Sequence, residues 1–419
     1  MSAITLDITR LGVDGDGIAE TANGPVYVPF SHPGDRLKAA VEKSRGTIMA
    51  LTEPAPDRIA PACRHFGPDG ENGACGGCSL QHVDPALYRD FKRGLVVNAL
   101  RARGIDIEVG ALVEAHPGER RRAILAARKT EKELLLGFNQ AGSHHIVNIS
   151  ECPVLKPSIV ARLGDIRVIG RALAPNAEPF RIGVLETLTG LDIAVDGLPK
   201  LTDAQRRAGI EVILKLRGIA RVSLDGEILI EPVRPVVRFG STEASPPAGG
   251  FTQATAEAEE AMATLVSGIV GKAKAVADLF AGSGTFALRL AAQSKVHAVE
   301  GDARAMAALE SAARNRQGLK PVTGEKRDLF RRPMMASELK TFDAVVFDPP
   351  RAGAEFQSKE LARSTVRKIA AVSCNPQTLA RDLSILVSGG YRVVSVTPID
   401  QFLWSPHVEV VAALERPKK

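Results

Sequence analysis

The chain has 419 residues, of which 45% are hydrophobic and 24% charged, and its formal net charge at pH 7 is +6. This length exceeds one ordinary hydrophobic core, so we expect two to four domains of a globular protein. No apolar run is long enough to span a membrane, and no basic, apolar leader opens the chain. These features argue against a membrane or secreted protein, and we expect a cytoplasmic one whose mild positive charge suits a polyanionic partner.

Short stretches of alternating apolar and polar residues occupy positions 1–55, as in "ITLDI", "GPVYVPF" and "GTIMAL". Gly-Asp and Gly-Pro turns separate these stretches, which predicts a small, strongly bent β-barrel. The proline-rich "TEPAPDRIAP" (52–61) indicates a linker, so the first domain is assigned to residues 1–57.

Four of the five cysteines belong to the next region, in the order Cys63, Cys75, Cys78 and Cys152. In a cytoplasmic protein, cysteines serve metals or chemistry more often than disulfides. Zinc sites more often show two paired knuckles, whereas three cysteines and a remote Cys-Pro are closer to ferredoxin spacing. The pattern therefore favours an iron–sulfur site, with zinc as the alternative.

The remainder of this region, up to residue 250, combines one helix with an irregular, strand-rich part. Residues 84–104 have apolar side chains at helical spacing, and we expect Lys92 and the arginines to form a solvated basic face. This helix is a candidate to pack on the C-terminal domain, residues 251–419. Stretches such as "ELLLGF" and "RVSLDGEILI" predict strands, and "STEASPPAGG" (241–250) predicts a second linker, so the central domain is assigned to 58–250.

From residue 251 to 419, predicted strands and helices alternate, which indicates a doubly wound α/β domain with a largely parallel sheet. "DLFAGSGTFALRLAA" (278–292) predicts an acidic strand end, a glycine-rich turn and a helix, where Gly282 and Gly284 let a ligand approach the backbone. The following strand ends on Glu300, a carboxylate suited to ribose hydroxyls. A dinucleotide-binding turn has a similar pattern. "FDPPRAGA" (347–354) decides between them, because a rigid acidic strand end at Asp348 suits a methyltransferase acting on a planar base.

Cys374 stands in "AVSCNPQTLARDL" (371–383), directly after a short apolar run and before Asn-Pro. Pro376 cannot continue a sheet ladder, so Cys374 is predicted at a strand tip, where α/β enzymes keep reactive groups.

Together these motifs resemble the uracil-C5 RNA methyltransferase family, specifically its iron–sulfur branch that modifies 23S ribosomal RNA. The resemblance extends over nearly the whole chain and includes "FTQAT", "DLFAGSGTF", "DPPRAGA", "SCNPQTLARDL" and "HVEVVAAL". It implies a Rossmann-like class I methyltransferase domain at 251–419, a [4Fe–4S] cluster on the four cysteines and a TRAM- or OB-like, RNA-binding first domain. It also implies S-adenosylmethionine as methyl donor, with cofactor positions at Gln253, Phe280, Thr285, Glu300, Asp328 and Asp348. Thr285 and Asp328 stand where the family commonly has asparagine.

Methylation of uracil at C5 requires a nucleophile, which gives Cys374 a role in the reaction that the resemblance implies. Uracil C5 is a poor nucleophile until a thiolate adds at C6, and a base must later remove the C5 proton. We expect Cys374 to be the nucleophile, its thiolate favoured by nearby positive dipoles or cations. The resemblance places the base on Glu409. Asp348 is expected to hold the uracil edge or the cofactor, and His407 to serve packing or capping.

The resulting hypothesis is a monomeric enzyme that methylates C5 of a specific uridine, in 23S ribosomal RNA. Three alternatives stay open. They are a tRNA uridine C5-methyltransferase, a noncatalytic RNA-binding protein on the same fold, and a flavin or nicotinamide oxidoreductase with an iron–sulfur centre.

Overall fold

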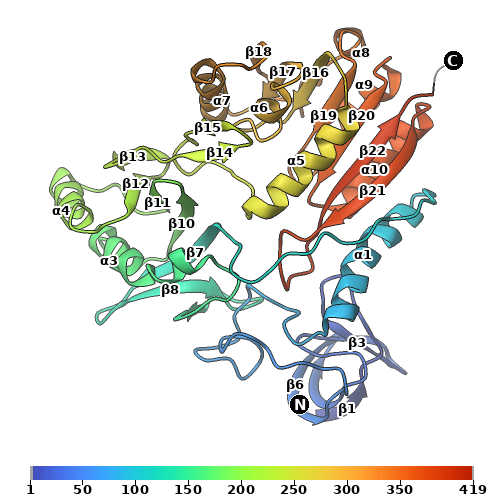
Figure 1. Ribbon diagram of the computed structural model, residues 1–419. Helices are drawn as coiled ribbons and strands as arrows, with labels where there is room; N and C mark the ends of the chain where they lie inside the picture. The colour runs from blue at the N-terminus through green and yellow to red at the C-terminus, as the bar shows by residue number, and fades with distance from the viewer. Residues whose placement is uncertain (1–2, 418–419) are drawn as a thin grey trace.

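The computed structural model describes residues 3–417, and in these the strands form three large sheets and one hairpin (Figure 1). The N-terminal sheet has six strands in the order β1-β5-β6-β4-β3-β2. Its strands are β1 (Ala3–Asp7), β2 (Arg10–Leu11), β3 (Gly17–Thr21), β4 (Gly24–Val28), β5 (Arg36–Glu42) and β6 (Arg45–Glu53). Only Ile8 and Thr9 separate the two edge strands β1 and β2 along the chain, so the sheet must curve until its edges adjoin.

The first helix, α1 (Pro85–Arg101), follows a segment of turns and loops that contains three of the cysteines. Asp84 caps this helix, because its Oδ1 accepts hydrogen bonds from the backbone N–H groups of Ala86 and Leu87. Pro85, at the first helical position, has no N–H to leave unsatisfied.

Helix α1 packs against the C-terminal sheet region, contacting α10 and β21. Its buried face includes Tyr88, Val96 and, unexpectedly, Lys92. The sequence analysis placed Lys92 on a solvated face, and that interpretation was wrong. Lys92 is 0% exposed because its Nζ donates to Asp400 Oδ1 at 2.9 Å and to backbone carbonyls of the 400–407 segment.

The central sheet has seven strands in the order β13-β12-β11-β10-β7-β8-β9, all antiparallel except the β11–β12 pair. Its strands are β7 (Arg122–Lys129), β8 (Leu134–Asn139), β9 (Ile146–Asn148), β10 (Phe180–Thr187), β11 (Gly190–Asp196), β12 (Ile219–Leu224) and β13 (Glu227–Ile230). Three helices, α2 (Pro157–Val160), α3 (Leu163–Leu173) and α4 (Asp203–Ile213), share its core. The hairpin of β14 (Val237–Phe239) and β15 (Thr242–Ala244) then leads to the last region.

The C-terminal sheet has the order β18-β17-β16-β19-β20-β22-β21, and its first five strands are parallel. Its strands are β16 (Ala275–Leu279), β17 (Lys295–Glu300), β18 (Val322–Lys326), β19 (Ala344–Phe347), β20 (Lys368–Ser373), β21 (Arg392–Ile399) and β22 (Glu409–Glu415). The helices are α5 (Ala256–Val270), α6 (Ala287–Leu290), α7 (Ala303–Asn315), α8 (Ala336–Leu339), α9 (Glu355–Arg363) and α10 (Pro376–Ser388). The predicted doubly wound α/β domain with a largely parallel sheet is confirmed.

Both faces of this sheet are covered, as a doubly wound sheet requires. Along β19, Val345 and Phe347 join the core that contains α9, α10 and α1. The intervening Ala344 and Val346 join the core that contains α5, α6 and α7. The near-continuous apolar run of the strand follows from burial on both sides.

No helix in the described part of the chain, residues 3–417, has both the length and the apolar character needed to cross a membrane.

Candidate active site and cysteine cluster

A cavity of about 500 Å³ opens at the carboxyl edge of the C-terminal sheet. All eight catalytic and cofactor positions named from the sequence line it: Gln253, Phe280, Thr285, Glu300, Asp328, Asp348, Cys374 and Glu409. They come from separate stretches of the chain. The parallel strands bring most of them together, because their carboxyl ends share one edge, whereas Gln253 precedes α5 and Glu409 begins the antiparallel strand β22.

Cys374 and Glu409 meet because β22 runs antiparallel to β20. Ser373, the last residue of β20, pairs with Val410. Cys374 follows Ser373 and Glu409 precedes Val410, so the two side chains start from neighbouring backbone positions at the cavity.

The electrostatics of Cys374 differ from the expectation that cations favour its thiolate. Burial raises the pKa of the Cys374 thiol to about 11, and the charges of Glu409 and Asp348 add to the rise. Arg351 lowers it, and Cys374 directly precedes Asn375, the N-cap of α10, but burial prevails. A pKa of about 11 favours the neutral thiol near neutral pH.

Two carboxyl groups share the cavity with this thiol. Burial first, and then the charge of Asp348, raise the pKa of Glu409 to about 8. Burial raises the pKa of Asp348 to about 7. Both groups can therefore gain or lose a proton near neutral pH, as general acids and bases require.

A chain of side-chain amides joins the two carboxyl groups. Gln401 Nε2 donates to Glu409 Oε1 and to Gln253 Oε1, each at 2.9 Å. Gln253 Nε2 donates to Asp348 Oδ2 at 3.1 Å. Gln401 was not predicted from the sequence, because it belongs to none of the quoted motifs.

The glycine-rich turn lies against the same cavity, but glycine occupies positions 282 and 284 for different structural reasons. Gly282 has φ +54°, and a Cβ there would meet open space, which leaves room for a ligand. Gly284 has φ +104°, and a Cβ would lie 2.8 Å from the Leu288 side chain. Gly284 is therefore explained by packing, and the idea that it admits a ligand was wrong.

Glu300 holds the turn as well as lining the cavity. Its Oε2 accepts from Gly282 N–H and its Oε1 from Asp302 N–H, both at 2.8 Å. Each oxygen keeps a second lone pair, so the carboxylate can still accept from ribose hydroxyls. Together with the aromatic pair Phe280–Phe330, whose ring centroids are 5.4 Å apart, these groups fit an adenosine-type cofactor. Asp278, the predicted acidic strand end, is instead fully buried within β16.

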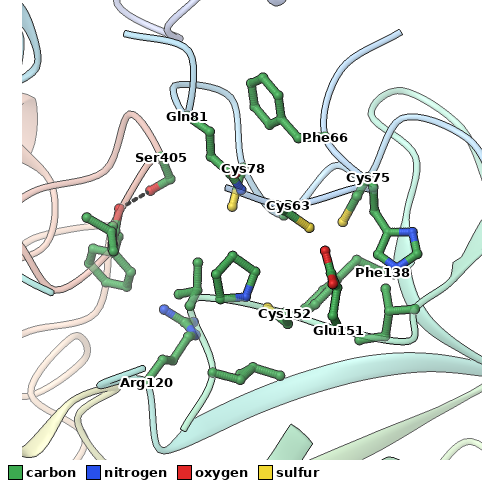
Figure 2. Close-up of a pocket in the computed structure, with 18 of the residues that line it drawn as sticks. Cys63, Phe66, Cys75, Cys78, Gln81, Arg120, Phe138, Glu151, Cys152 and Ser405 are labelled. Carbon is green, nitrogen blue, oxygen red and sulfur yellow. Dashed lines mark hydrogen bonds between the residues drawn. The ribbon is translucent and has the colours of Figure 1, made fainter. Parts of the chain in front are cut away.

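The other four cysteines line a second pocket, of about 200 Å³. Figure 2 shows Cys63, Cys75 and Cys78 on one side of this space and Cys152 on the opposite side. Burial raises the pKa of all four thiols, to about 11 for Cys75. Ionising four buried thiols in one pocket would be unfavourable without a partner for their negative charge. A bound metal would stabilise the thiolates, so the group of cysteines suits metal binding.

The spacing of the sulfur atoms bears on which metal would fit. Zinc–sulfur bonds of about 2.3 Å place the ligand atoms of a tetrahedral site close together. Within residues 3–417, ligand atoms of three metal-binding side chains lie within 4.8 Å of one another only at His32, Asp57 and Asp84. No three of the four cysteine sulfurs therefore lie within 4.8 Å of one another, so these side chains do not form a compact tetrahedral zinc site as they stand.

Arg120 adds a charge argument for an anionic occupant. It lines the cysteine pocket, and its guanidinium lies 5.7 Å from the ring centroid of Phe402. Among the described residues, no carboxylate forms an ion pair with it. A thiolate-bound cluster would supply the missing negative charge. His407 also lines this pocket and not the cavity that contains Cys374, in keeping with a packing role.

Comparisons with known proteins agree with this geometry. The family profile described as tRNA (Uracil-5-)-methyltransferase matches residues 205–417. An uncharacterized RNA methyltransferase of Rhizobium meliloti is 65% identical over 416 residues, which cover 99% of this chain and all of that protein. The 23S rRNA (uracil(1939)-C(5))-methyltransferase RlmD of Halomonas elongata is 32% identical, with 98% of this chain and 89% of that protein covered.

Among solved structures, the Pyrococcus abyssi tRNA (uracil-54, C5)-methyltransferase in complex with S-adenosyl-L-homocysteine aligns with a TM-score of 0.75. The alignment covers 98% of this chain and 99% of that one, at 24% identity. At this identity the likeness speaks for the fold.

Proposed function

The chain belongs to the uracil-C5 RNA methyltransferase family, and we propose that it methylates C5 of a uridine in 23S ribosomal RNA through a covalent adduct with Cys374. The observation that carries the mechanism is the placement of Cys374 and Glu409 at adjacent positions of β20 and β22, in one cavity. S-adenosylmethionine supplies an electrophilic methyl group when bound. The residues that would hold it are Gln253, Phe280, Thr285, Glu300, Asp328 and Asp348, all of which line the cavity.

The reaction begins at Cys374. Its thiolate forms a bond to C6 of uracil, and the electrons of the C5–C6 double bond make C5 nucleophilic. With S-adenosylmethionine bound, C5 would take the methyl group as the sulfur–methyl bond of the cofactor breaks and its sulfonium becomes a thioether, and C5 then carries both a proton and a methyl. Glu409 removes that proton, the C5–H electrons restore the double bond, and the C6–sulfur bond breaks to release Cys374.

The raised pKa values support this division of roles. A base with a pKa of about 8 binds a proton well enough to remove it from carbon, yet is partly ionised near neutral pH. Cys374 needs the opposite change, a lower pKa, because its thiol must lose a proton before the thiolate can attack C6. Arg351, whose charge lowers the pKa of Cys374, is placed to assist.

The remaining modules serve RNA binding in this proposal. Residues 1–57 form a TRAM-like domain, 58–250 a central domain and 251–419 the catalytic domain. A [4Fe–4S] cluster is held by Cys63, Cys75, Cys78 and Cys152. It cross-links and stabilises loops that have little hydrophobic core of their own. The gathering of the four thiols in one pocket with Arg120, which has no carboxylate partner among residues 3–417, supports the cluster.

Ribosomal RNA is preferred as substrate because the Halomonas relative, with 32% identity over 98% of this chain, is named for it. A tRNA substrate is the second candidate, favoured by the description of the family profile, tRNA (Uracil-5-)-methyltransferase, that matches residues 205–417. Both are cytoplasmic RNAs. Incubation of unmodified 23S rRNA and tRNA with the protein and S-adenosylmethionine, followed by nucleoside analysis, tests the proposal. We expect 5-methyluridine in the rRNA, whereas methylated adenosine in either RNA would overturn it.

A further inference from the structure

Gln401 lies between the two carboxyl groups of the active site and is itself only 2% exposed. It stands just after β21, in the segment that leads to Glu409. Its side chain uses every strong hydrogen-bonding group it has. Both Nε2 hydrogens are donated, one to Glu409 and one to Gln253, and Oε1 accepts from Ala254 N–H at 2.6 Å.

This pattern fixes the orientation of the amide. A flipped amide would turn its oxygen toward two oxygen acceptors and its NH₂ group toward a backbone N–H, losing all three bonds. The direction of the neighbouring amide follows. Gln253 must accept through Oε1, so its Nε2 faces Asp348 as a donor.

The consequence for Glu409 is a difference between its two oxygens. Oε1 accepts from Gln401, whereas Oε2 is buried and has no hydrogen-bond partner among the described residues. A buried oxygen without a partner is a costly feature that binding of a proton or a polar ligand would relieve. Oε2 is therefore the oxygen available for a proton.

We propose that Gln401 is a positioning residue of the methylation reaction: it holds Glu409 by Oε1 and leaves Oε2 to take the proton from C5. This inference rests on the proposed function, since it concerns the last step of that mechanism. In that step the C5–H bond breaks, its electrons form the C5–C6 double bond, the sulfur of Cys374 leaves C6, and the proton ends on Oε2. Gln401 touches no reacting atom and acts through Glu409.

The test uses Gln401→Met, which keeps the approximate length of the side chain and removes its hydrogen bonds. Gln357→Met is the matched control, because Gln357 is also buried, at 1% exposed, and its amide bonds twice to the Met334 backbone away from the cavity. Single-turnover reactions with uridine-containing RNA separate methyl transfer from adduct release. We expect Gln401→Met to slow release about ten- to a hundredfold, part of the roughly 10²- to 10⁴-fold that a positioned base supplies. Methyl transfer should change far less, so that the protein–RNA adduct accumulates.

The pH profile of adduct release supplies a second readout. The groups that face Glu409 are Gln401, Asp348 and Cys374, and the Gln401 hydrogen bond lowers the pKa of Glu409. Loss of that bond should move the midpoint of the profile to higher pH, and Gln401→Glu should move it further because it adds a negative charge. Gln357→Met should leave both the pH midpoint of adduct release and the amount of accumulated protein–RNA adduct unchanged.

The outcomes separate the two proposals. If the wild type forms no adduct with 5-fluorouridine RNA, the proposed mechanism fails, and this inference with it. If the wild type forms the adduct but Gln401→Met releases product at the wild-type rate, or slows both steps equally without a pH shift, the inference alone is wrong.

Discussion

Glu409 begins β22 beside the point where the chain leaves β20 at Cys374, so a thiol and a carboxyl group lie next to each other at the ends of two antiparallel strands. The segment between them along the chain forms α10, β21 and the loop that carries Gln401. In the proposed mechanism the two groups act at different times, Cys374 first at C6 and Glu409 last at C5.

Replacing Glu409 by glutamine should therefore stall the reaction after methyl transfer. The amide cannot remove the C5 proton, so Cys374 stays bonded to C6 and a methylated protein–RNA adduct accumulates. Denaturing electrophoresis with labelled RNA measures this adduct. Normal turnover by Glu409→Gln would assign the base to another group, with Asp348 as the next candidate.

The same substitution should change stability in a pH-dependent manner. Below the ordinary pKa of 4.5 for a glutamate, Glu409 is protonated in both folded and unfolded protein. Between there and about 8, the unfolded chain loses the proton that the folded protein keeps, so stability falls by about 1.4 kcal/mol per pH unit. The amide introduced by Glu409→Gln does not titrate, so the variant lacks this loss.

Thermal unfolding of both proteins at pH 5 and pH 9 measures this effect. We expect Glu409→Gln to be more stable than the wild type at pH 9, with a much smaller difference at pH 5. An equal difference in stability between the two proteins at pH 5 and pH 9 would show that Glu409 does not keep its proton on folding.

The buried ion pair between Lys92 and Asp400 should be a main link between α1 and the catalytic domain. Both side chains are at most 1% exposed, and Tyr88 also donates to Asp400. Lys92→Met leaves a buried carboxylate short of a partner and should cost about 3–5 kcal/mol, partly recovered by adding Asp400→Asn. Chemical denaturation measures this cost. Arg10→Met, which breaks an exposed pair with Glu20, is the control and should cost under about 1 kcal/mol.

The cysteine pocket makes a separate prediction about metal content. Protein purified without oxygen should be brown and contain about four irons per chain. Cys75→Ser should lose iron and damage folding or RNA binding more than binding of S-adenosylmethionine, because Cys75 lines a different pocket. Stoichiometric zinc without iron would contradict the cluster.

The strand tips of the C-terminal sheet could be predicted because local sequence determines them. An apolar run that stops at Asp-Pro-Pro or Cys-Asn-Pro marks its own end, and parallel strands then bring such ends to one edge. The alternation of short strands and helices likewise indicated the α/β fold.

Gln401 and Lys92 could not be predicted in this way. Their partners are remote in sequence: Gln401 bonds to Gln253, and Lys92 bonds to Asp400, 308 residues away. A lysine among arginines on a helix has the pattern of a solvated face, and only the folded structure supplies the carboxylate that makes its burial favourable. The shifted pKa of Cys374 is a similar case, because burial and two carboxylates from other strands determine it.

The most direct test of the central claim is trapping of the wild-type protein on RNA that carries 5-fluorouridine, in the presence of S-adenosylmethionine. Fluorine cannot leave C5 as a cation, so the reaction should stop with the nucleophile still bonded to C6. We predict a covalent complex that survives denaturation, whose cross-linked peptide maps to Cys374, and no complex with Cys374→Ala. Attachment at another residue, or methyl transfer by Cys374→Ala, would contradict the account.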